Sequence, residues 1–413
     1  MGFISVAYIS RSTTYNDVDY TDQDLRTKVG ADLIMSDNAY EFHFFGENRT
    51  DLDPVDPAET AYDPFRDLGD TQEASSSYVY EAHFDMNHVM KLNQLRLGRQ
   101  ASTRDGWIYF DGIAADLKLS SEWFFTVSGG KSVHYHETTP GSDVTAIFGV
   151  DYSPLESTKL SLDVLSAKDE RTQRKEVTDQ NDQMVSLKLQ QLFAPGSKGI
   201  AKVRWLNGET RDMTLSSLNS DLAGFELYFR YFRQLLLQQE LSNETSLFYD
   251  VLGDSNPYHS YDLKVRKEFA DNYSLSLGYF ARALLDTEDE SVFNREYSRA
   301  FTVFEVYEFL MENLSLSLTG EQWQSKTYEG NSGGFDLEYR NGKKRALKVN
   351  VGTYFSLYKY EDYLELGERT EVQTQYVKAT IPVGEHYKVT GGVEMEQSLE
   401  DYQTMKVEVR RDF

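Results

Sequence analysis

The stretch that decides the fold is YQTMKVEVRRDF, residues 402–413. Every second side chain of this stretch forms a mainly apolar face: Met405, Val407, Val409, Arg411 and Phe413. The intervening side chains form a polar face: Thr404, Lys406, Glu408, Arg410 and Asp412. A period of two residues is that of a β-strand whose two faces meet different surroundings. We therefore predict an amphipathic strand that ends on the aromatic ring of Phe413.

This strand resembles the C-terminal strand of Gram-negative outer-membrane β-barrels. The resemblance implies that Phe413 closes the barrel and that the strand helps to address the chain to the barrel-assembly machinery. It also implies a location in the outer membrane of a Gram-negative bacterium, with membrane lipid and lipopolysaccharide as partners. In such a barrel the apolar face of each strand meets lipid and the polar face lines the lumen.

Composition favours one barrel domain over residues 1–413. The chain has 8 Pro and no Cys, and no Pro/Ser/Gly-rich linker divides it. Its 28 Tyr and 24 Phe are typical of the aromatic girdles at membrane–water interfaces. No apolar run approaches the length of about 18 residues that a transmembrane helix needs. No signal peptide is visible at the start, so we expect the sequence to be that of a mature, exported chain.

Alternation recurs along the chain and predicts an all-β, antiparallel, up-and-down barrel. Leu314, Leu316 and Leu318, for example, alternate with small polar residues. The links between such stretches alternate in length, as short periplasmic turns and longer extracellular loops do. The predicted short links are 36–38, 153–156, 194–197, 270–272, 341–343 and 382–385, and the predicted long links are 10–24, 48–76, 134–143, 167–182, 285–294, 324–333 and 359–370. The strand number should be even and between 16 and 22, with about 22 as the best value. Residues 224–269 can be divided into strands and loops in more than one way.

The net charge of −25 argues against a nucleic-acid partner, because phosphate binding requires an excess of Lys and Arg. An acidic surface suits divalent-ion bridging to lipopolysaccharide or a preference for cations in a pore. The longest link concentrates this charge in an acidic loop: Asp51, Asp53, Asp56, Glu59, Asp63, Asp67, Asp70 and Glu73. Three interpretations stay open for it: a loop folded into the lumen, a calcium-binding outer loop, and a solvated outer loop.

Charged side chains on the polar faces of predicted strands are candidates for the lumen wall. In the hairpin that begins near residue 95, Arg96 and Gln100 should share the inward face, and Asp111 should meet them across the hairpin. The other lumen-facing candidates are Asp163, Lys188, Arg282, Lys348, Lys388, Glu394 and Glu408. Their mixed signs favour a wet lumen over a filter for a single ion.

No sequence motif supports catalysis, so we expect no enzyme. The chain lacks a Gly-x-Ser-x-Gly elbow, a His-Glu-x-x-His helix, a glycine-rich phosphate loop and a cysteine nucleophile. His134 and His136 would share one face of a strand, but no second cluster in the sequence completes a metal shell. We therefore expect neither a metal nor a cofactor.

Two functions follow from the predicted architecture. The first is a porin-like channel for small polar or charged solutes. The second is a sheath or secretion scaffold whose lumen holds a partner. In outline the chain resembles the porin-like components of porin–cytochrome conduits, which implies a multihaem cytochrome in the lumen; an exported polysaccharide is the other cargo. The chain has no Cys-x-x-Cys-His, so any haem would belong to the partner.

Overall fold

The structure is a computed structural model, and it describes residues 1–15, 18–35, 39–53, 75–104, 108–133, 144–173, 176–236, 256–270, 272–290, 295–326, 329–341, 346–360, 368–397 and 401–413. These residues form one 22-stranded sheet. The strands are β1 (Gly2–Tyr15), β2 (Val18–Met35), β3 (Tyr40–Asp51), β4 (Ser75–Asn87), β5 (Gln94–Ala101), β6 (Tyr109–Lys118), β7 (Trp123–Val133), β8 (Val144–Leu155), β9 (Thr158–Gln173), β10 (Glu176–Ala194), β11 (Ser197–Leu206), β12 (Glu209–Leu222), β13 (Phe225–Gln234), β14 (Tyr258–Phe269), β15 (Tyr273–Leu284), β16 (Tyr297–Val306), β17 (Leu314–Ser325), β18 (Glu329–Arg340), β19 (Lys348–Tyr360), β20 (Glu368–Val383), β21 (Tyr387–Gln397) and β22 (Asp401–Asp412). A short 3₁₀ helix, η2 (Thr287–Asp289), lies between β15 and β16.

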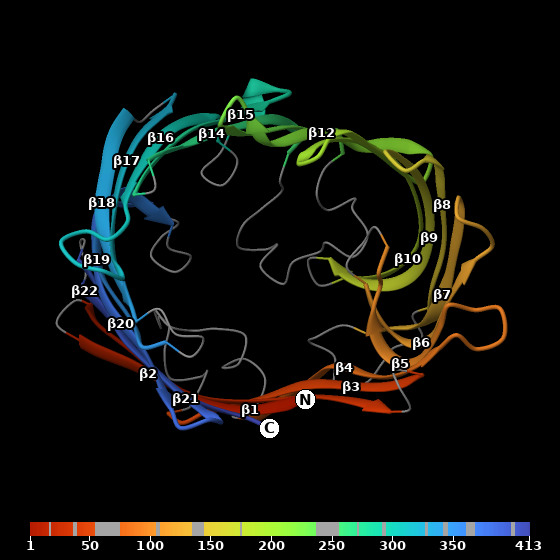
Figure 1. Ribbon diagram of the computed structural model, residues 1–413, viewed down its shortest axis with the longest axis horizontal. Helices are drawn as coiled ribbons and strands as arrows, with labels where there is room; N and C mark the ends of the chain where they lie inside the picture. The colour runs from red at the N-terminus through yellow and green to blue at the C-terminus, as the bar shows by residue number, and fades with distance from the viewer. Residues whose placement is uncertain are drawn as a thin grey trace.

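The sheet closes on itself, because β1 pairs antiparallel with both β2 and β22. Every other strand pairs with its neighbours along the chain, as Figure 1 shows in a view through the ring of strands. The predicted antiparallel up-and-down barrel is confirmed, with 22 strands among the described residues, as the alternation predicts. Residues 224–269 divide into β13, a link and β14.

The two faces of the wall differ as the alternation predicts. Phe304, Leu318 and Phe335 are register partners on three neighbouring strands, and each side chain is about 40% exposed: 38%, 44% and 40% respectively. Apolar side chains at alternate positions are similarly exposed around the barrel, whereas buried polar side chains occupy the intervening positions. A closed barrel with an apolar outer surface is built for lipid, and this places the protein in the outer membrane. Among the described residues, no helix is long and apolar enough to cross a membrane.

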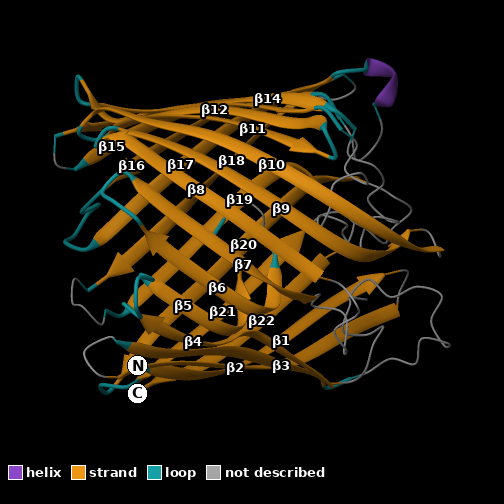
Figure 2. Ribbon diagram, turned by 90° about the vertical axis from the view of Figure 1, so that its right-hand side faces the viewer, coloured by secondary structure: helices purple, strands orange, loops and turns teal. Residues whose placement is uncertain are grey.

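Both termini lie on one rim of the barrel (Figure 2), and the predicted short links 153–156, 194–197 and 382–385 belong to this periplasmic rim. Residues 36–38, 271, 342 and 343 of the other predicted short links lie outside the described residues. Two turns of the periplasmic rim contain residues with the left-handed backbone of tight hairpins: Gly196 (φ 75°) lies between Pro195 and Ser197, and Ala223 (φ 56°) precedes Gly224 (φ 77°). Glycine reaches this conformation without a steric cost from a Cβ atom.

The extracellular rim differs in part from the prediction. The links expected at 10–24, 167–182 and 324–333 are largely strand, since β1 ends at Tyr15, β9 at Gln173 and β17 at Ser325. A two-residue turn, Asn207-Gly208, also joins β11 to β12 on this rim. The polar composition of these segments predicted loops. Instead β9 and β10 have 16 and 19 residues, more than the roughly 9–11 residues that a strand needs to span a bilayer. Backbone pairing continues into solvent regardless of side-chain polarity. In Figure 1, β10 bends inward from the ring.

A row of glycines crosses β5, β6 and β7 on the inner face. Gly98 pairs with Gly112, which pairs with Gly130. A Cβ atom on Gly112 would lie 2.1 Å from the carbonyl oxygen of Gly129 and 2.7 Å from the Cα of Gly130. The absence of side chains therefore lets three neighbouring strands approach more closely than Ala would allow, a device that curves a sheet.

Candidate functional site: the lumen wall

The lumen wall carries buried charges that are paired across strands. Asp24 on β2 is fully buried and accepts hydrogen bonds from three guanidinium groups: Arg49 Nε at 2.9 Å, Arg11 Nη2 at 3.2 Å and Arg26 Nη2 at 3.3 Å. Arg11 also lies 3.2 Å from Asp22. Because a buried carboxylate is costly unless it is paired, these contacts hold β1, β2 and β3 in register.

A second set of contacts ties the link after β5 to the wall. Arg104 follows β5, and its side chain is only 10% exposed. Its Nη1 lies 2.9 Å from Asp151 on β8 and 3.4 Å from Asp163 on β9, and its Nη2 donates to Thr126 Oγ1 on β7 at 2.8 Å. Gly149 makes room for it, since a Cβ there would lie 2.6 Å from Arg104 Nε. Arg104, at the described start of the link, is therefore held against the inner face of three strands.

Apolar packing anchors the same link. Ile108, at its far end, belongs to a buried cluster with Ile147, Leu165, Met184 and Leu206. Leu236, just after β13, packs against this cluster. Apolar side chains on an otherwise polar wall bury their surface only if another segment covers them. Segments after β5 and after β13 therefore converge on the inner face of β8–β11.

On the far side of the lumen, arginines alternate with aromatic rings. The guanidinium of Arg282 lies 4.3 Å from the ring centroid of Tyr258, and that of Arg299 lies 5.2 Å from the ring of Trp323. Tyr297 packs against Trp323 with ring centroids 5.3 Å apart. Arg299 also pairs with Glu321. These contacts place guanidinium cations against the faces of aromatic rings on the lumen wall.

Links at the extracellular rim are also joined by charge. Lys326, just after β17, donates from Nζ to Glu290 Oε2 at 2.9 Å. This hydrogen bond raises the pKa of Lys326. The contact joins the link after β15 to the link after β17.

The structure places the predicted lumen residues as follows. Arg96 donates from Nε and Nη2 to Asp85 at 2.7 and 2.8 Å, and Gln100 is buried. Lys348 Nζ lies 2.8 Å from Glu338. The remaining candidates that share the inner face by register and burial are Asp163, Lys188, Arg282, Lys388, Glu394 and Glu408.

Asp111 does not face the lumen, and the predicted contact of Asp111 with Arg96 and Gln100 is wrong. Asp111 is the register partner of Arg99, which holds it with two hydrogen bonds of 2.7 Å. It lies two positions from Ile113, which is 55% exposed on the outer face. The pairing register, which the sequence did not reveal, sets Asp111 opposite an odd-numbered residue of β5 and so turns it outward.

The acidic loop falls mostly outside the described residues, which include Asp51 and Asp53 but not Asp56, Glu59, Asp63, Asp67, Asp70 or Glu73. Asp53 accepts a hydrogen bond from the backbone N–H of Gln23 at 2.7 Å, and its own N–H donates to Asp51 at 3.1 Å. Oxygens of Asp22, Asp51 and Asp53 lie within 4.8 Å of one another. His134 and His136 are also outside the described residues.

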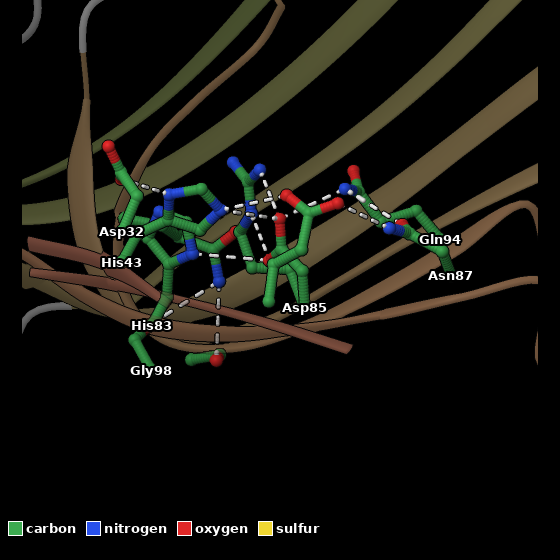
Figure 3. Close-up of polar contacts among 11 residues, drawn as sticks. Asp32, His43, His83, Asp85, Asn87, Gln94 and Gly98 are labelled. Atoms are coloured by element: carbon green, nitrogen blue, oxygen red, sulfur yellow. Dashed lines mark hydrogen bonds and ion pairs between the residues drawn. The ribbon is translucent and has the colours of Figure 1, made fainter. Parts of the chain in front are cut away.

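A histidine cluster that was not predicted from the sequence lies near the periplasmic rim. Figure 3 shows its polar contacts. His43 on β3 and His83 on β4 are register partners, with ring centroids 4.7 Å apart. One ligand atom from each of His43, His83 and Asp85 lies within 4.8 Å of the other two. The two histidines are 40 positions apart, so they form no local sequence motif. The alternating polar residues of β3 were the available sequence indication that His43 faces the lumen.

Comparisons with known proteins agree with the architecture. No family model matches the chain. No curated protein matches it. The translocation pore of the P pilus usher PapC is similar over 100% of both chains, at 9% identity and a TM-score of 0.56. The ferric enterobactin receptor PfeA, solved with BCV-L6, is similar over 100% of this chain and 81% of its own, at 9% identity and a TM-score of 0.58. OccK8 (OprE) of Pseudomonas aeruginosa is similar over 99% of this chain and 97% of its own, at 9% identity and a TM-score of 0.46. At such identities the likeness concerns the fold, and the fold of this chain is that of a Gram-negative outer-membrane β-barrel.

Proposed function

We propose that the protein is an outer-membrane pore for small polar or charged solutes. The observation that carries this proposal is the contrast between the two faces of the wall. The outer face exposes apolar side chains such as Leu318 and Phe335, whereas the inner face holds paired charges such as Asp24 with Arg49. A polar inner face lowers the cost of moving a hydrated solute across the membrane.

The pinned link after β5 supports a pore of restricted width. A 22-stranded barrel is wide, and barrels of this size need their lumen narrowed or filled if they are not to leak. Arg104 holds this link against the inner face of β7, β8 and β9. Leu236 brings a second segment to the same part of the wall. Both segments reduce the cross-section available to a solute.

The net charge of −25 leads us to expect a preference for cations. Single-channel recording in a planar bilayer tests both parts of the proposal. Steady conductance of the order of hundreds of picosiemens, with a reversal potential on the cation side in a potassium chloride gradient, would support it. Silence from a correctly folded, heat-modifiable barrel would contradict the open pore, and an anion-side reversal potential would contradict the assigned selectivity.

The strand number favours a second candidate, a sheath or secretion scaffold whose lumen holds a partner. Barrels of 16–18 strands leave an aqueous channel, whereas barrels of 22 strands enclose a plug. The PapC barrel, similar in fold, is described as a translocation pore. In this candidate the partner is a multihaem cytochrome or an exported polysaccharide, and any haem belongs to the partner because the chain has no Cys. Large, noisy and unselective openings of the isolated barrel would support the sheath over the solute channel.

A further inference from the structure

The histidine cluster has a hydrogen-bond arrangement that suits a metal ion. His43 Nδ1 lies 2.7 Å from Asp32 Oδ1, and His83 Nδ1 lies 3.1 Å from Asp85 Oδ1. A carboxylate accepts hydrogen bonds, so Asp32 favours the tautomer of His43 whose Nδ1 is protonated. In the neutral imidazole the other nitrogen, Nε2, then carries the lone pair. Metal-binding histidines have this arrangement, in which a carboxylate fixes the tautomer of the ligand.

The Nε2 atom of His43 faces carboxylate oxygen atoms. It lies 3.3 Å from Glu41 Oε2 and 3.8 Å from Asp85 Oδ2. Between these oxygens, Nε2 is stabilised by a cation, which is either a proton on the ring or a metal ion bound to its lone pair. Imidazole nitrogen together with carboxylate oxygen is a donor set that suits Zn²⁺ and related transition metals.

The surrounding residues hold the two carboxylates in place. Asp85 is 1% exposed, and it receives Arg96 through two hydrogen bonds and Gln94 Nε2 at 2.9 Å. Asn87 Nδ2 donates to the other oxygen of Glu41, Oε1, at 2.9 Å. Ligating carboxylates in metal sites are themselves hydrogen-bonded in this way. Figure 3 shows these contacts converging from β2, β3, β4 and β5.

We propose that His43, His83, Asp85 and Glu41 form a binding site for a divalent transition-metal ion on the lumen wall near the periplasmic rim. The ion is coordinated by His43 Nε2 and the neighbouring carboxylate oxygens, and it ties β3 to β4. His43 and Asp32 also line a cavity of about 610 Å³, which gives the ion a route from solution. The site does not depend on whether the lumen conducts solutes or holds a partner.

Zinc binding by the untagged, chelator-treated barrel in detergent tests the site. Isothermal titration at neutral pH should give one equivalent of Zn²⁺ per chain. His43→Ala and His83→Ala should each weaken binding at least about 10-fold, and Asp32→Ala, which removes the acceptor of His43 Nδ1, should weaken it by about 10–100-fold. Co²⁺ should give ligand-field absorption bands that are lost in His43→Ala.

His386→Ala is the matched control, because His386 lines the same cavity but lies outside the histidine cluster. It should bind Zn²⁺ as the wild type does. Heat-modifiable electrophoretic mobility checks that each variant is folded. Absence of stoichiometric Zn²⁺ binding to the wild type, or equal affinity in the wild type and both histidine variants, would overturn the site and leave the pore proposal unaffected.

Discussion

Gly2 and Phe413 join the two ends of the barrel wall through a reciprocal pair of backbone hydrogen bonds. Gly2 N donates to Phe413 O at 2.8 Å, and Phe413 N donates to Gly2 O at 2.9 Å. The seam continues along β1 and β22, with register partners from Phe3 and Asp412 to Thr13 and Tyr402. A Cβ atom on Gly2 would lie 2.6 Å from the Phe413 ring, so the glycine lets the ring pack over the seam.

Deleting Phe413 should weaken barrel closure by about 1–3 kcal/mol, because two hydrogen bonds of about 0.5–1.5 kcal/mol each are lost. Phe413→Leu keeps both backbone hydrogen bonds and should therefore reduce the free energy of unfolding by less. Urea unfolding of the barrel in lipid vesicles measures the difference. If both variants lose the same free energy of unfolding, the ring rather than the hydrogen-bonded pair secures the seam.

Leu318→Arg should destabilise the folded barrel by about 2–4 kcal/mol if the residue lies near the bilayer midplane, because a guanidinium would face lipid. Thr319→Arg, the next residue on β17, should have a small effect because it adds its charge to the wet lumen. The free energy of unfolding in vesicles compares them. Equal costs at both positions would contradict the assignment of the two faces.

Gly112→Ala should cost about 1–3 kcal/mol, because the new methyl group would overlap rigid backbone atoms of β7. Gly320→Ala serves as the control: its Cβ would have one neighbour, the Thr302 Cγ2 atom, at the ordinary distance of 3.5 Å. Thermal or urea unfolding measures both. A harmless Gly112→Ala would mean that the row of glycines does not set the curvature of the wall.

Arg104→Gln should loosen the inward link and raise both the conductance and the current noise of the pore. The variant loses its charged contacts with Asp151 and Asp163. A hydrogen bond to a charged group contributes about 1.5–3 kcal/mol to stability. Arg99→Gln makes the same change on the outer face and should leave conductance unchanged. Identical single-channel traces for wild type and Arg104→Gln would show that this link does not narrow the lumen.

Asp24→Asn should shift the reversal potential toward anions, because Arg11, Arg26 and Arg49 would lose their shared carboxylate. Removal of one partner from a buried ionic cluster should also cost about 3–5 kcal/mol of folding free energy. Asp19→Asn, on the outer face of the same strand, makes the same change in net charge and should move the reversal potential less. The two reversal potentials in a salt gradient decide the outcome.

Much of the fold was predictable because its signals are local. The alternation in residues 402–413 predicts β22, and similar alternation predicts the other strands and the two faces. The polar hairpins β1–β2 and β9–β10 were mistaken for loops because side-chain polarity reports contact with water and says nothing of backbone pairing. The inner face of most candidate residues also follows from parity within a single strand.

The amino-acid sequence by itself determined the alternation of the strands, the lipid-facing surface and the acidic character of the protein, since each depends on residues that are close together in the chain. The tertiary structure alone decided which residues meet across strands. It set His43 beside His83, carried Arg104 to Asp151 and turned Asp111 toward Arg99. The physical reason is register: a shift of one residue between neighbouring strands preserves the period of two within each strand but changes every partner across the barrel wall.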